Sequence, residues 1–491
     1  MHQTYSPFRG LGGRFINYKY MKKSVILFLL VVFSAGIMSA KIKVASILGD
    51  NMVLQRNSEV KLRGKADPDQ KLNLTIGWNK EKITTVANEK GEWLVKVKTT
   101  EAGGPYTLTI TSGKEKVVLQ NILLGEVWLC SGQSNMEMTV AGFGDSPVNG
   151  STDALLSAAN DNIRLFSLAR NTKDVPQDSC TGKWSVASAE SVAKFSAVGY
   201  FYARQLQQSL NVPVGMICSS FGGSRIESWI KNDVITGFTE AFKQTTQEKT
   251  PQHHRASRLY NGMIAPILNY TIKGALWYQG EANVGNYQDY PALLAAMVKS
   301  WRADFGLGEF PFYFVQIAPC WYNNPKANNS AFLREAQQKA MSLIPNSGMV
   351  TTVDFGEERN IHPAEKAAVS KRLALWALSE TYGQKGLPYK SPVFKSMEVK
   401  DSIAVISFDN VVNGLTTYGK TVDCFEVAGQ DSIFYPAILT IAQKQARIYS
   451  PRVKVPVAVR YHFINFAQTN GFLYNTAGLP VMPFRTDNLK K

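Results

Sequence analysis

Ser134 is a residue whose type and setting could support covalent chemistry. It lies in the segment 125–138, GEVWLCSGQSNMEM, in which an apolar run ends in small polar residues before the chain turns amphipathic again. This change is typical of a turn after a strand, and α/β proteins place their sites at such strand ends. The segment does not match the G-x-S-x-G pattern of the α/β-hydrolase nucleophile. On its own, therefore, Ser134 is more often a turn residue than a nucleophile.

A nucleophilic serine needs a base, and histidine is the usual one. After residue 40 the histidines are His253, His254, His362 and His462. The first two lie in a polar stretch that we interpret as an exposed loop, and His462 lies in a predicted strand. His362 follows a predicted strand and precedes Pro363, which we place at the first position of a helix. The proline would hold His362 rigidly, which favours it as the base, although a helix-start residue without function is the alternative.

Two further strand ends carry groups that could stabilise an oxyanion. Gly222 and Gly223 directly follow an apolar run in SSFGGSRIESWI, and glycine lets backbone N–H groups approach a ligand closely. The segment ALWYQGEAN ends a third apolar run with Gln279 and Asn283, whose side-chain amides can donate hydrogen bonds. Each feature is weak alone, since a glycine pair is more often a plain loop. Together with a serine and a rigid histidine they fit acyl transfer from a serine.

The elements expected around these residues fall into three regions. Residues 41–120 contain short stretches that alternate apolar and polar side chains between turn signals, which is typical of a β-sandwich. In residues 121–390, apolar runs alternate with amphipathic stretches, which predicts βαβ units and a mainly parallel sheet. Residues 391–491 return to strand-like patterns and predict a C-terminal β-rich region. The predicted fold class is therefore α/β with accessory β-rich regions.

The bulk properties of the chain exclude several function classes. Its 491 residues are 45% hydrophobic and 19% charged, which allows several domains with large cores and excludes a disordered or collagen-like chain. The net charge is +16, but Lys and Arg are scattered without a basic block, so we expect no nucleic acid partner. The 5 cysteines are widely spaced without a C-x-x-C pair, so we expect no metal site, and their pairing stays open.

Residues 1–40 predict an N-terminal extension followed by a signal peptide. From Met21 the sequence reads MKKSVILFLLVVFSAGIMSA, with a basic start, a short apolar run and small residues as far as Ala40. The apolar run is too short for a membrane-spanning helix, so we expect no membrane span in the mature protein. A buried core helix is the alternative. We expect secretion across the inner membrane into the periplasm, with the true start at Met21 and cleavage after Ala40.

Several segments of the chain match a known family. The chain resembles the sialate O-acetylesterases of the SGNH (GDSL-like) hydrolase superfamily, in family order and over nearly the whole chain after residue 40. The matching segments are DNMVLQR (50–56), GEVWLCSGQSNMEM (125–138), FGGSRIESW (221–229), LYNGMIAPI (259–267), GALWYQGEAN (274–283), LREAQ (333–337), VDFG…NIHPAEK (353–366) and LYNTAGLPVMPFRTD (473–487). The resemblance implies an SGNH-like three-layer α/β/α catalytic domain over 121–390, with accessory β-sandwich regions.

Site roles follow from the resemblance, residue by residue. It implies that Ser134 is the nucleophile and His362 the base. The Ser134 N–H and the N–H of one glycine of the pair, for which we favour Gly223, would be backbone oxyanion donors. The QGE block stands where other superfamily members use an asparagine side chain. Gln279 is our first candidate for that donor and Asn283 the second.

The sequence departs from the superfamily pattern at one position. Many members have an aspartate three residues before the histidine, and here that residue is Arg359. Asp354, Glu357 and Glu358 are then candidates to orient His362. A backbone carbonyl could serve instead, and a Ser–His dyad without an acid fits the sequence equally well.

The resemblance implies a serine esterase that removes O-acetyl groups from carbohydrate through an acetyl-enzyme intermediate. O-acetylated sialic acids are the expected substrates, and no cofactor or metal is implied. An acidic sugar needs a cationic contact, for which Arg225 is a candidate, although it could equally be a structural arginine. The alternatives are an acetyl esterase for another glycan such as acetyl-xylan and, in another class, a non-catalytic carbohydrate-binding protein. The oligomeric state stays open.

Overall fold

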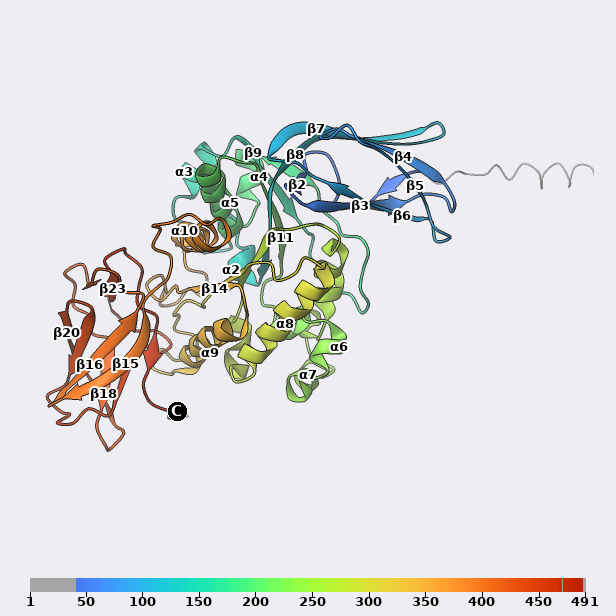
Figure 1. Ribbon diagram of the computed structural model, residues 1–491. Coiled ribbons are helices and arrows are strands. Elements are labelled where there is room, and N and C mark those ends of the chain that lie inside the picture. Colours follow the sequence, from blue (N-terminus) through green and yellow to red (C-terminus); the bar gives the residue numbers. More distant parts are fainter. Residues whose placement is uncertain (1–40, 470, 489–491) are drawn as a thin grey trace, which may run out of the picture.

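A computed structural model describes residues 41–469 and 471–488, and the predicted extension and signal peptide lie outside them. A β-rich region stands at each end of a central α/β unit, so the molecule is elongated (Figure 1). Among the described residues, no helix has both the length and the apolar character that crossing a membrane requires. All 5 cysteines are free thiols.

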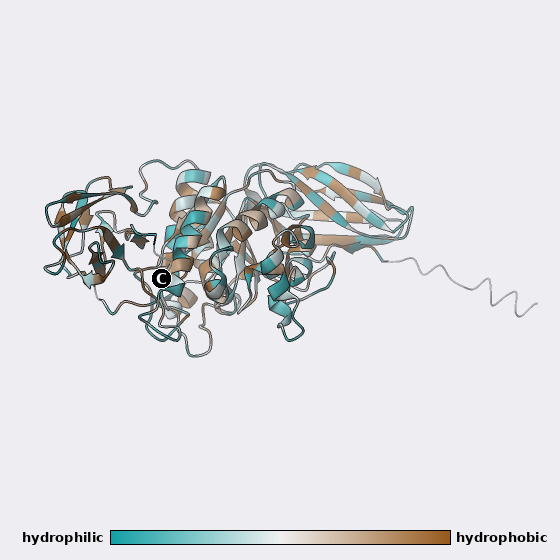
Figure 2. Ribbon diagram, turned by 90° about the horizontal axis from the view of Figure 1, so that it is seen from below, coloured by the Kyte–Doolittle hydropathy of each residue, from teal (hydrophilic) through white to brown (hydrophobic). Residues whose placement is uncertain are grey.

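The N-terminal region consists of two facing β-sheets. Residues alternate between buried and exposed along its strands, as in the pattern of β4, and Figure 2 shows the matching alternation of hydrophobic (brown) and hydrophilic (teal) residues. One sheet contains β1 (Lys43–Val44), β3 (Glu59–Lys65) and β6 (Glu92–Lys98). The other contains β2 (Val53–Gln55), β4 (Lys71–Ile76), β5 (Lys82–Val86), β7 (Gly103–Ser112) and the first part of β8 (Glu115–Gly132).

The long strand β8 passes from the N-terminal sheet into the central sheet without a break. Its first part pairs with β7, and its second part pairs with β11 and β12. The predicted boundary at residue 120 therefore falls inside one strand. The central order is β10-β9-β11-β8-β12-β13-β14, parallel except for β10. These strands are β9 (Asn160–Ser167), β10 (Trp184–Ala187), β11 (Val214–Ser220), β12 (Gly274–Tyr278), β13 (Phe312–Val315) and β14 (Ser347–Val350).

Helices cover both faces of the central sheet. Trp128 and Cys130 of β8 pack into a core with α5 (Ala197–Leu210) and α10 (Lys366–Trp376). Val127 and Leu129, which point to the other face of the sheet, pack into the core that includes α8 (Tyr290–Phe305) and α9 (Asn329–Leu343). A parallel sheet buried on both faces explains why its strands read as unbroken apolar runs. The three-layer α/β/α prediction is confirmed.

Short helical segments connect these elements. The α-helical ones are α2 (Ser134–Glu137), α3 (Ser151–Leu156), α4 (Ala189–Ala193), α6 (Asn232–Ile235) and α7 (Thr239–Thr245). The remaining short 3₁₀ and π-helical segments are η1 (Ile226–Trp229), η2 (Gln252–His254), η3 (Tyr260–Ile264), η4 (Ala265–Ile267), η5 (Glu281–Asn286) and η6 (Ala377–Thr381).

The C-terminal region is built from β-strands around its own core. One sheet has the order β15 (Val393–Lys400), β16 (Ile403–Asp409), β21 (Gln445–Tyr449), β20 (Ile438–Ala442). A second has the order β19 (Phe434–Pro436), β18 (Phe425–Ala428), β22 (Ala458–Tyr461), β24 (Phe484–Arg485), and β17 (Leu415–Thr416) pairs with β23 (Tyr474–Asn475). Buried Arg334 of α9 donates to the His462 carbonyl at 3.3 Å, which joins this region to the catalytic unit.

Candidate active site

Three central strands end at the same level, and this places the candidate segments side by side. Gly132, the last residue of β8, is aligned with Ser220 of β11 on one side and with Tyr278 of β12 on the other. The chain runs from β8 to the far side of β11 and then crosses to β12, so the order of the sheet reverses at β8. Ligand sites of open α/β sheets lie at the carboxyl ends of strands at such a point.

Ser134 is the first residue of α2, directly after a sharp turn. Gly132 has a φ of +138°, and a Cβ there would lie 2.1 Å from the Tyr278 carbonyl oxygen, so only glycine fits. The Ser134 side chain is largely buried, at 9% exposure. Within the described residues, neither its Oγ nor its backbone N–H has a hydrogen-bond partner. Both groups are therefore free to interact with a substrate.

His362 lies in the loop between β14 and α10. The helix begins at Lys366, where Glu365 caps it, and not at Pro363 as expected. The loop is held instead by side chains: the His362 N–H donates to Asn360 Oδ1 at 2.9 Å, and Asn360 Nδ2 donates to Glu357 Oε2 at 2.9 Å. The histidine is thus fixed through its backbone.

The environment of the imidazole favours its neutral form. Its ring packs edge-on against Phe143, with 5.2 Å between the ring centroids. Burial lowers the pKa of His362, and the positive charge of Lys366 lowers it further, while Asp145 opposes both. A neutral imidazole can accept a proton from a serine. Within the described residues neither ring nitrogen forms a hydrogen bond.

The candidate orienting acids have other partners. Asp354 makes two bonds to Arg372, of 2.8 and 2.7 Å. Glu357 accepts hydrogen bonds within its own loop, and Glu358 lies 3.7 Å from Arg359. The structure therefore does not bring Asp354, Glu357 or Glu358 into contact with the imidazole.

The glycine pair lies against α2, the helix that begins with Ser134. A Cβ on Gly222 would be 3.5 Å from the Cβ of Ser134. The Gly222 N–H donates to Glu137 Oε2 at 2.8 Å, and Glu137 makes two bonds of 2.6 Å to Arg170. Gly223 has a φ of +72°, and its N–H has no acceptor within the described residues. Of the two glycines, Gly223 is thus the one with a free donor.

Gln279 and Asn283 are buried and support the loop after β11. Gln279 Nε2 donates to the Ser224 carbonyl at 3.0 Å and to Asn283 Oδ1 at 2.7 Å, so both of its N–H groups are used. Asn283 Nδ2 donates to Glu227 Oε2 at 2.9 Å, which leaves it one further N–H. Only Asn283 of the two retains a donor for a ligand in this conformation.

Arg225 lies at the end of the same loop, partly buried. Its Nε is shielded from solvent and has no hydrogen-bond partner. Its charge acts on two neighbours. Burial raises the pKa of Glu227, and the charge of Arg225 lowers it. Burial lowers the pKa of His254, and the charge of Arg225 lowers it further. The guanidinium is therefore close to the glycine pair, in a partly desolvated setting.

Two groups of residues at the site were missed from the sequence. His254 Nε2 contacts the Gly223 carbonyl at 2.6 Å, and His253 stacks on Phe221 at 5.0 Å, so this pair is not a free surface loop. The sequence gives no spacing signal for it. The second group begins at Asn135, which directly follows the candidate Ser134 in GQSNM and could have been singled out for that reason.

Asn135 links three parts of the site through its buried amide. Its Nδ2 donates to Glu281 Oε1 at 2.6 Å and to the Ile361 carbonyl at 3.0 Å. Its Oδ1 accepts from Lys366 Nζ at 2.6 Å. Burial lowers the pKa of Lys366 to about 7 and raises that of Glu281. Since Ile361 precedes His362, this amide brings the serine turn and the histidine loop together.

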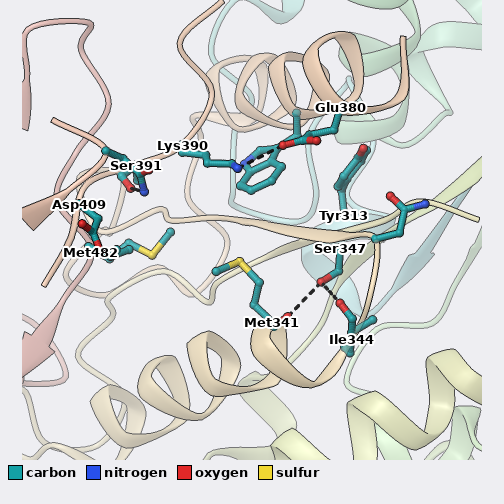
Figure 3. A pocket seen from close by; sticks show the side chains of 13 residues that line it. Tyr313, Met341, Ile344, Ser347, Glu380, Lys390, Ser391, Asp409 and Met482 are labelled. Atoms are coloured by element: carbon teal, nitrogen blue, oxygen red, sulfur yellow. Dashed lines mark hydrogen bonds and ion pairs between the residues drawn. The ribbon is translucent and has the colours of Figure 1, made fainter. Parts of the chain in front are cut away.

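A separate cavity lies between the catalytic unit and the C-terminal region. It measures about 670 Å³ and is lined by residues that include Tyr313, Trp376, Lys390 and Asp409. Figure 3 shows the Lys390–Glu380 ion pair at its edge. None of the candidate site residues lines it.

The fold and the site define the class of protein. A parallel sheet between two helical layers, with a serine at a strand–helix turn and a histidine on the loop after the last strand, is the arrangement of an SGNH-type ester hydrolase. The chain belongs to the family described as carbohydrate esterase, sialic acid-specific acetylesterase, whose model matches residues 124–378.

Individual relatives agree with this family. The mouse sialate O-acetylesterase is 27% identical, with 92% of this chain and 95% of the mouse protein covered. The human sialate O-acetylesterase is 29% identical, over 74% of this chain and 75% of the human protein. The crystal structure of a carbohydrate acetylesterase from Xanthomonas citri is 32% identical with a TM-score of 0.83, and covers 91% of this chain and 100% of that chain.

Proposed function

We propose that this enzyme removes O-acetyl groups from sialic acids, with Ser134 as nucleophile and His362 as base. The family and the relatives named sialate O-acetylesterase support the reaction and the substrate. One structural observation carries the site assignment. The Asn135 amide bonds to the residue before His362, so the serine turn and the histidine loop meet at the carboxyl edge of the sheet, beside the free Gly223 N–H.

The reaction proceeds in two steps. His362 accepts the proton of Ser134 Oγ as the oxygen attacks the acetyl carbonyl carbon, and the N–H groups of Ser134 and Gly223 bind the resulting oxyanion. Asn283 is the side chain with an amide hydrogen left to join them. Collapse of the tetrahedral intermediate releases the sugar alcohol, which takes the proton from His362. Water, deprotonated by His362, then hydrolyses the acetyl-enzyme to acetate.

The roles of the other candidates follow from their contacts. Gln279 holds the Ser224 carbonyl, and so keeps the glycine loop against β12. Among the described residues, Asp354, Glu357 and Glu358 all bond elsewhere, which supports a Ser–His dyad held by the backbone contacts of the histidine loop. Arg225 stays a candidate for contact with the substrate carboxylate.

Acetate release tests this proposal. The wild-type protein is expected to release acetate from O-acetylated sialic acids in preference to acetyl-xylan, and Ser134→Ala and His362→Ala to reduce kcat by several orders of magnitude. Ser219→Ala is a matched control, because Ser219 is a buried serine one strand away that bonds to the Met263 carbonyl. If the wild type acts on acetyl-xylan alone, the substrate assignment fails. Full activity in Ser134→Ala would overturn the site assignment.

We also propose that residues 1–40 direct the protein across the inner membrane and are removed, with the periplasm as its location. The short apolar run after the lysines supports this. Cell fractionation and N-terminal sequencing of the mature protein test it. A mature protein that begins upstream of the apolar run, or one found in the cytoplasm, would contradict it.

A further inference from the structure

A hollow of about 540 Å³ lies beside the histidine loop. Residues from the loop after β13 and from the loop after β14 line it: Cys320, Trp321, Tyr322, Asn323, Arg359 and Ile361. β13 and β14 end level with each other, so both loops leave the sheet at the edge that carries Ser134. Ile361 precedes His362 and is bonded to Asn135. An occupant of this hollow would therefore contact the residue that directly precedes His362.

The charge of Arg359 is available in this hollow. Its guanidinium carbon lies 4.5 Å above the Trp321 ring centroid. Within the described residues its ion-pair partner is Glu358, at 3.7 Å, and the Arg359 side chain is 76% exposed. An exposed pair at such a distance contributes little. The guanidinium thus keeps its N–H groups for another anion.

Backbone contacts hold the loop beneath this arginine. The Trp321 N–H donates to the Glu358 carbonyl at 2.8 Å, which joins the two loops. Asn465 of the C-terminal region accepts from the Cys320 N–H at 3.2 Å and donates through Nδ2 to the Asn324 carbonyl at 2.9 Å. A ring fixed in this way limits the freedom of the guanidinium stacked on it, which lowers the entropy lost on binding.

We propose that Arg359, stacked on Trp321, binds the carboxylate of an acidic sugar while its acetyl group is at Ser134. This proposal rests on the proposed function and names its carboxylate subsite. Arginine binds a carboxylate through two parallel hydrogen bonds, and the neighbouring Asn323 amide can donate to a sugar hydroxyl. Arg225 is the competing cation, but its Nε is shielded from solvent.

Paired substrates test the proposal. The kcat/KM is measured for an O-acetylated sialic acid, for the carboxyl methyl ester of the same sugar and for p-nitrophenyl acetate. Arg359→Gln is expected to lower kcat/KM for the free acid by about tenfold to a hundredfold, mainly through KM, and to leave the other two substrates nearly unchanged. Arg359→Lys keeps the positive charge but cannot form two parallel hydrogen bonds to a carboxylate. Its kcat/KM for the free acid is expected to lie between those of the wild type and Arg359→Gln. Arg452→Gln is the matched control, because Arg452 also stacks on a ring, that of Tyr435, in the C-terminal region.

Each outcome decides between readings. Equal losses on all three substrates, or no loss on the free acid, overturn the carboxylate subsite. A selective loss in Arg225→Gln and not in Arg359→Gln moves the subsite to the glycine loop. If the wild type releases acetate from p-nitrophenyl acetate but from neither sugar, the proposed function fails and the subsite fails with it.

A second inference concerns the buried amide of Asn135, described above. Lys366 is fully buried, and it enters the site from the first turn of α10. Groups on four elements face its ammonium: Asn135 of α2, Glu281 of η5, the Tyr278 ring of β12 at 5.7 Å, and Glu357 and His362 of the loop. Glu281 Oε2 has no partner within the described residues, so Glu281 and Lys366 reach each other through Asn135.

We infer that Asn135 and Lys366 are positioning residues: Asn135 holds the histidine loop against the serine turn, and Lys366 holds the Asn135 amide in place. Asn135 fixes the carbonyl before His362. Lys366, bonded to the same amide, carries a positive charge that adds to the effect of burial and lowers the pKa of His362, while Asp145 raises it. With a pKa of about 7, Lys366 is mainly charged in the acidic range where His362 titrates, so its charge is present when it affects the imidazole. Without that charge the pKa of His362 rises, and more of the base is protonated at a given acidic pH.

The pH profile of kcat/KM on p-nitrophenyl acetate tests this role. Lys366→Met is expected to move the acidic limb to higher pH, so that its activity loss is larger at pH 6 than at pH 8. Lys371→Met, an exposed lysine on the same helix, is the matched control. Because Lys366→Met leaves Glu281 buried without a cation, the double variant Lys366→Met/Glu281→Gln provides a folded alternative with the same expected shift. An unmoved acidic limb in the folded double variant overturns the inference.

Asn135→Ala separates positioning from charge. It removes the bond to the Ile361 carbonyl and is expected to lower kcat by about tenfold or more with little change in KM. Asn135→Asp keeps an acceptor for Lys366 but loses the donor to Ile361, so it should not restore kcat. Full kcat in both variants would refute the positioning role of Asn135.

Discussion

Replacing Glu137 with glutamine would test whether the carboxylate at the end of α2 holds the glycine loop against Ser134. Glu137 is three residues after Ser134 and accepts from Arg170 twice, at 2.6 Å, and from the Gly222 N–H at 2.8 Å. Glutamine has the same shape but a single acceptor oxygen and no charge. Its oxygen can take the place of Oε2, but its NH2 group then faces the Arg170 Nε–H, so one of the three bonds is lost and the bonds from Arg170 and Gly222 to that oxygen are weakened by the loss of charge.

The expected changes in the free energy of unfolding and in kcat follow from these contacts. A buried charge-assisted hydrogen bond contributes about 1.5–3 kcal/mol, but the Arg170 side chain is 50% exposed, which weakens the pair. We therefore expect the free energy of unfolding to fall by about 1 kcal/mol. Loss of one oxyanion donor costs about a hundredfold to a thousandfold in kcat. Since the Gly223 N–H is displaced and not removed, we expect about a tenfold lower kcat.

The assay combines urea unfolding with steady-state kinetics on p-nitrophenyl acetate. Glu190→Gln is the matched control, because Glu190 pairs with Lys194 on an exposed helix surface and should change neither quantity measurably. Suppose that Glu137→Gln shows the expected loss of stability and yet keeps the kcat of the wild type. That result would refute the idea that this carboxylate places the oxyanion donor.

Three further predictions concern pH, the Asp354 ion pair and the C-terminal contact. The acidic limb of kcat/KM in the wild type should have its midpoint below 6.5, the usual pKa of histidine, since burial and Lys366 lower the pKa of His362; a midpoint above 6.5 would contradict this. Asp354→Ala should lower the free energy of unfolding by about 3–5 kcal/mol, because it leaves buried Arg372 unpaired, without moving that midpoint. Arg334→Met removes its hydrogen bonds to C-terminal carbonyls and should make the C-terminal region more sensitive to limited proteolysis, while an unchanged cleavage pattern would show that other contacts suffice.

The layers of the fold could be predicted because burial leaves a periodic trace in the sequence. Strands of the central sheet are covered on both faces and read as unbroken apolar runs, whereas the N-terminal strands alternate. The continuity of β8 could not be predicted. Asn121, with a φ of +55°, looks like a turn signal, but the strand continues through an irregularity there, because Leu119 and Ile122 on either side of it pair with β7.

The site was predictable only where a residue acts through its own chemistry. Ser134 and His362 stand out by type and setting. The hydrogen-bond partners of Gln279 cannot be recognised in the same way, because Ser224 is 55 positions away. Only the folded chain shows that both amide hydrogens of Gln279 already form hydrogen bonds. The start of α10 was misplaced for a similar reason. Pro363 fits a first helical position, but capping by Glu365 sets the start at Lys366.

The shared strand β8 has a consequence for how this protein can be divided. Its residues Leu123–Gly125 pair with β2 of the N-terminal region, and the same strand ends two residues before Ser134. Gln55 and Arg56 also bond to Glu126 within it, at 3.0 and 2.6 Å. A cut within residues 115–132 would therefore divide the strand that leads to Ser134, and a cut before Glu115 would leave the first part of that strand without β7. We therefore expect the N-terminal region and the central sheet to unfold in one cooperative transition.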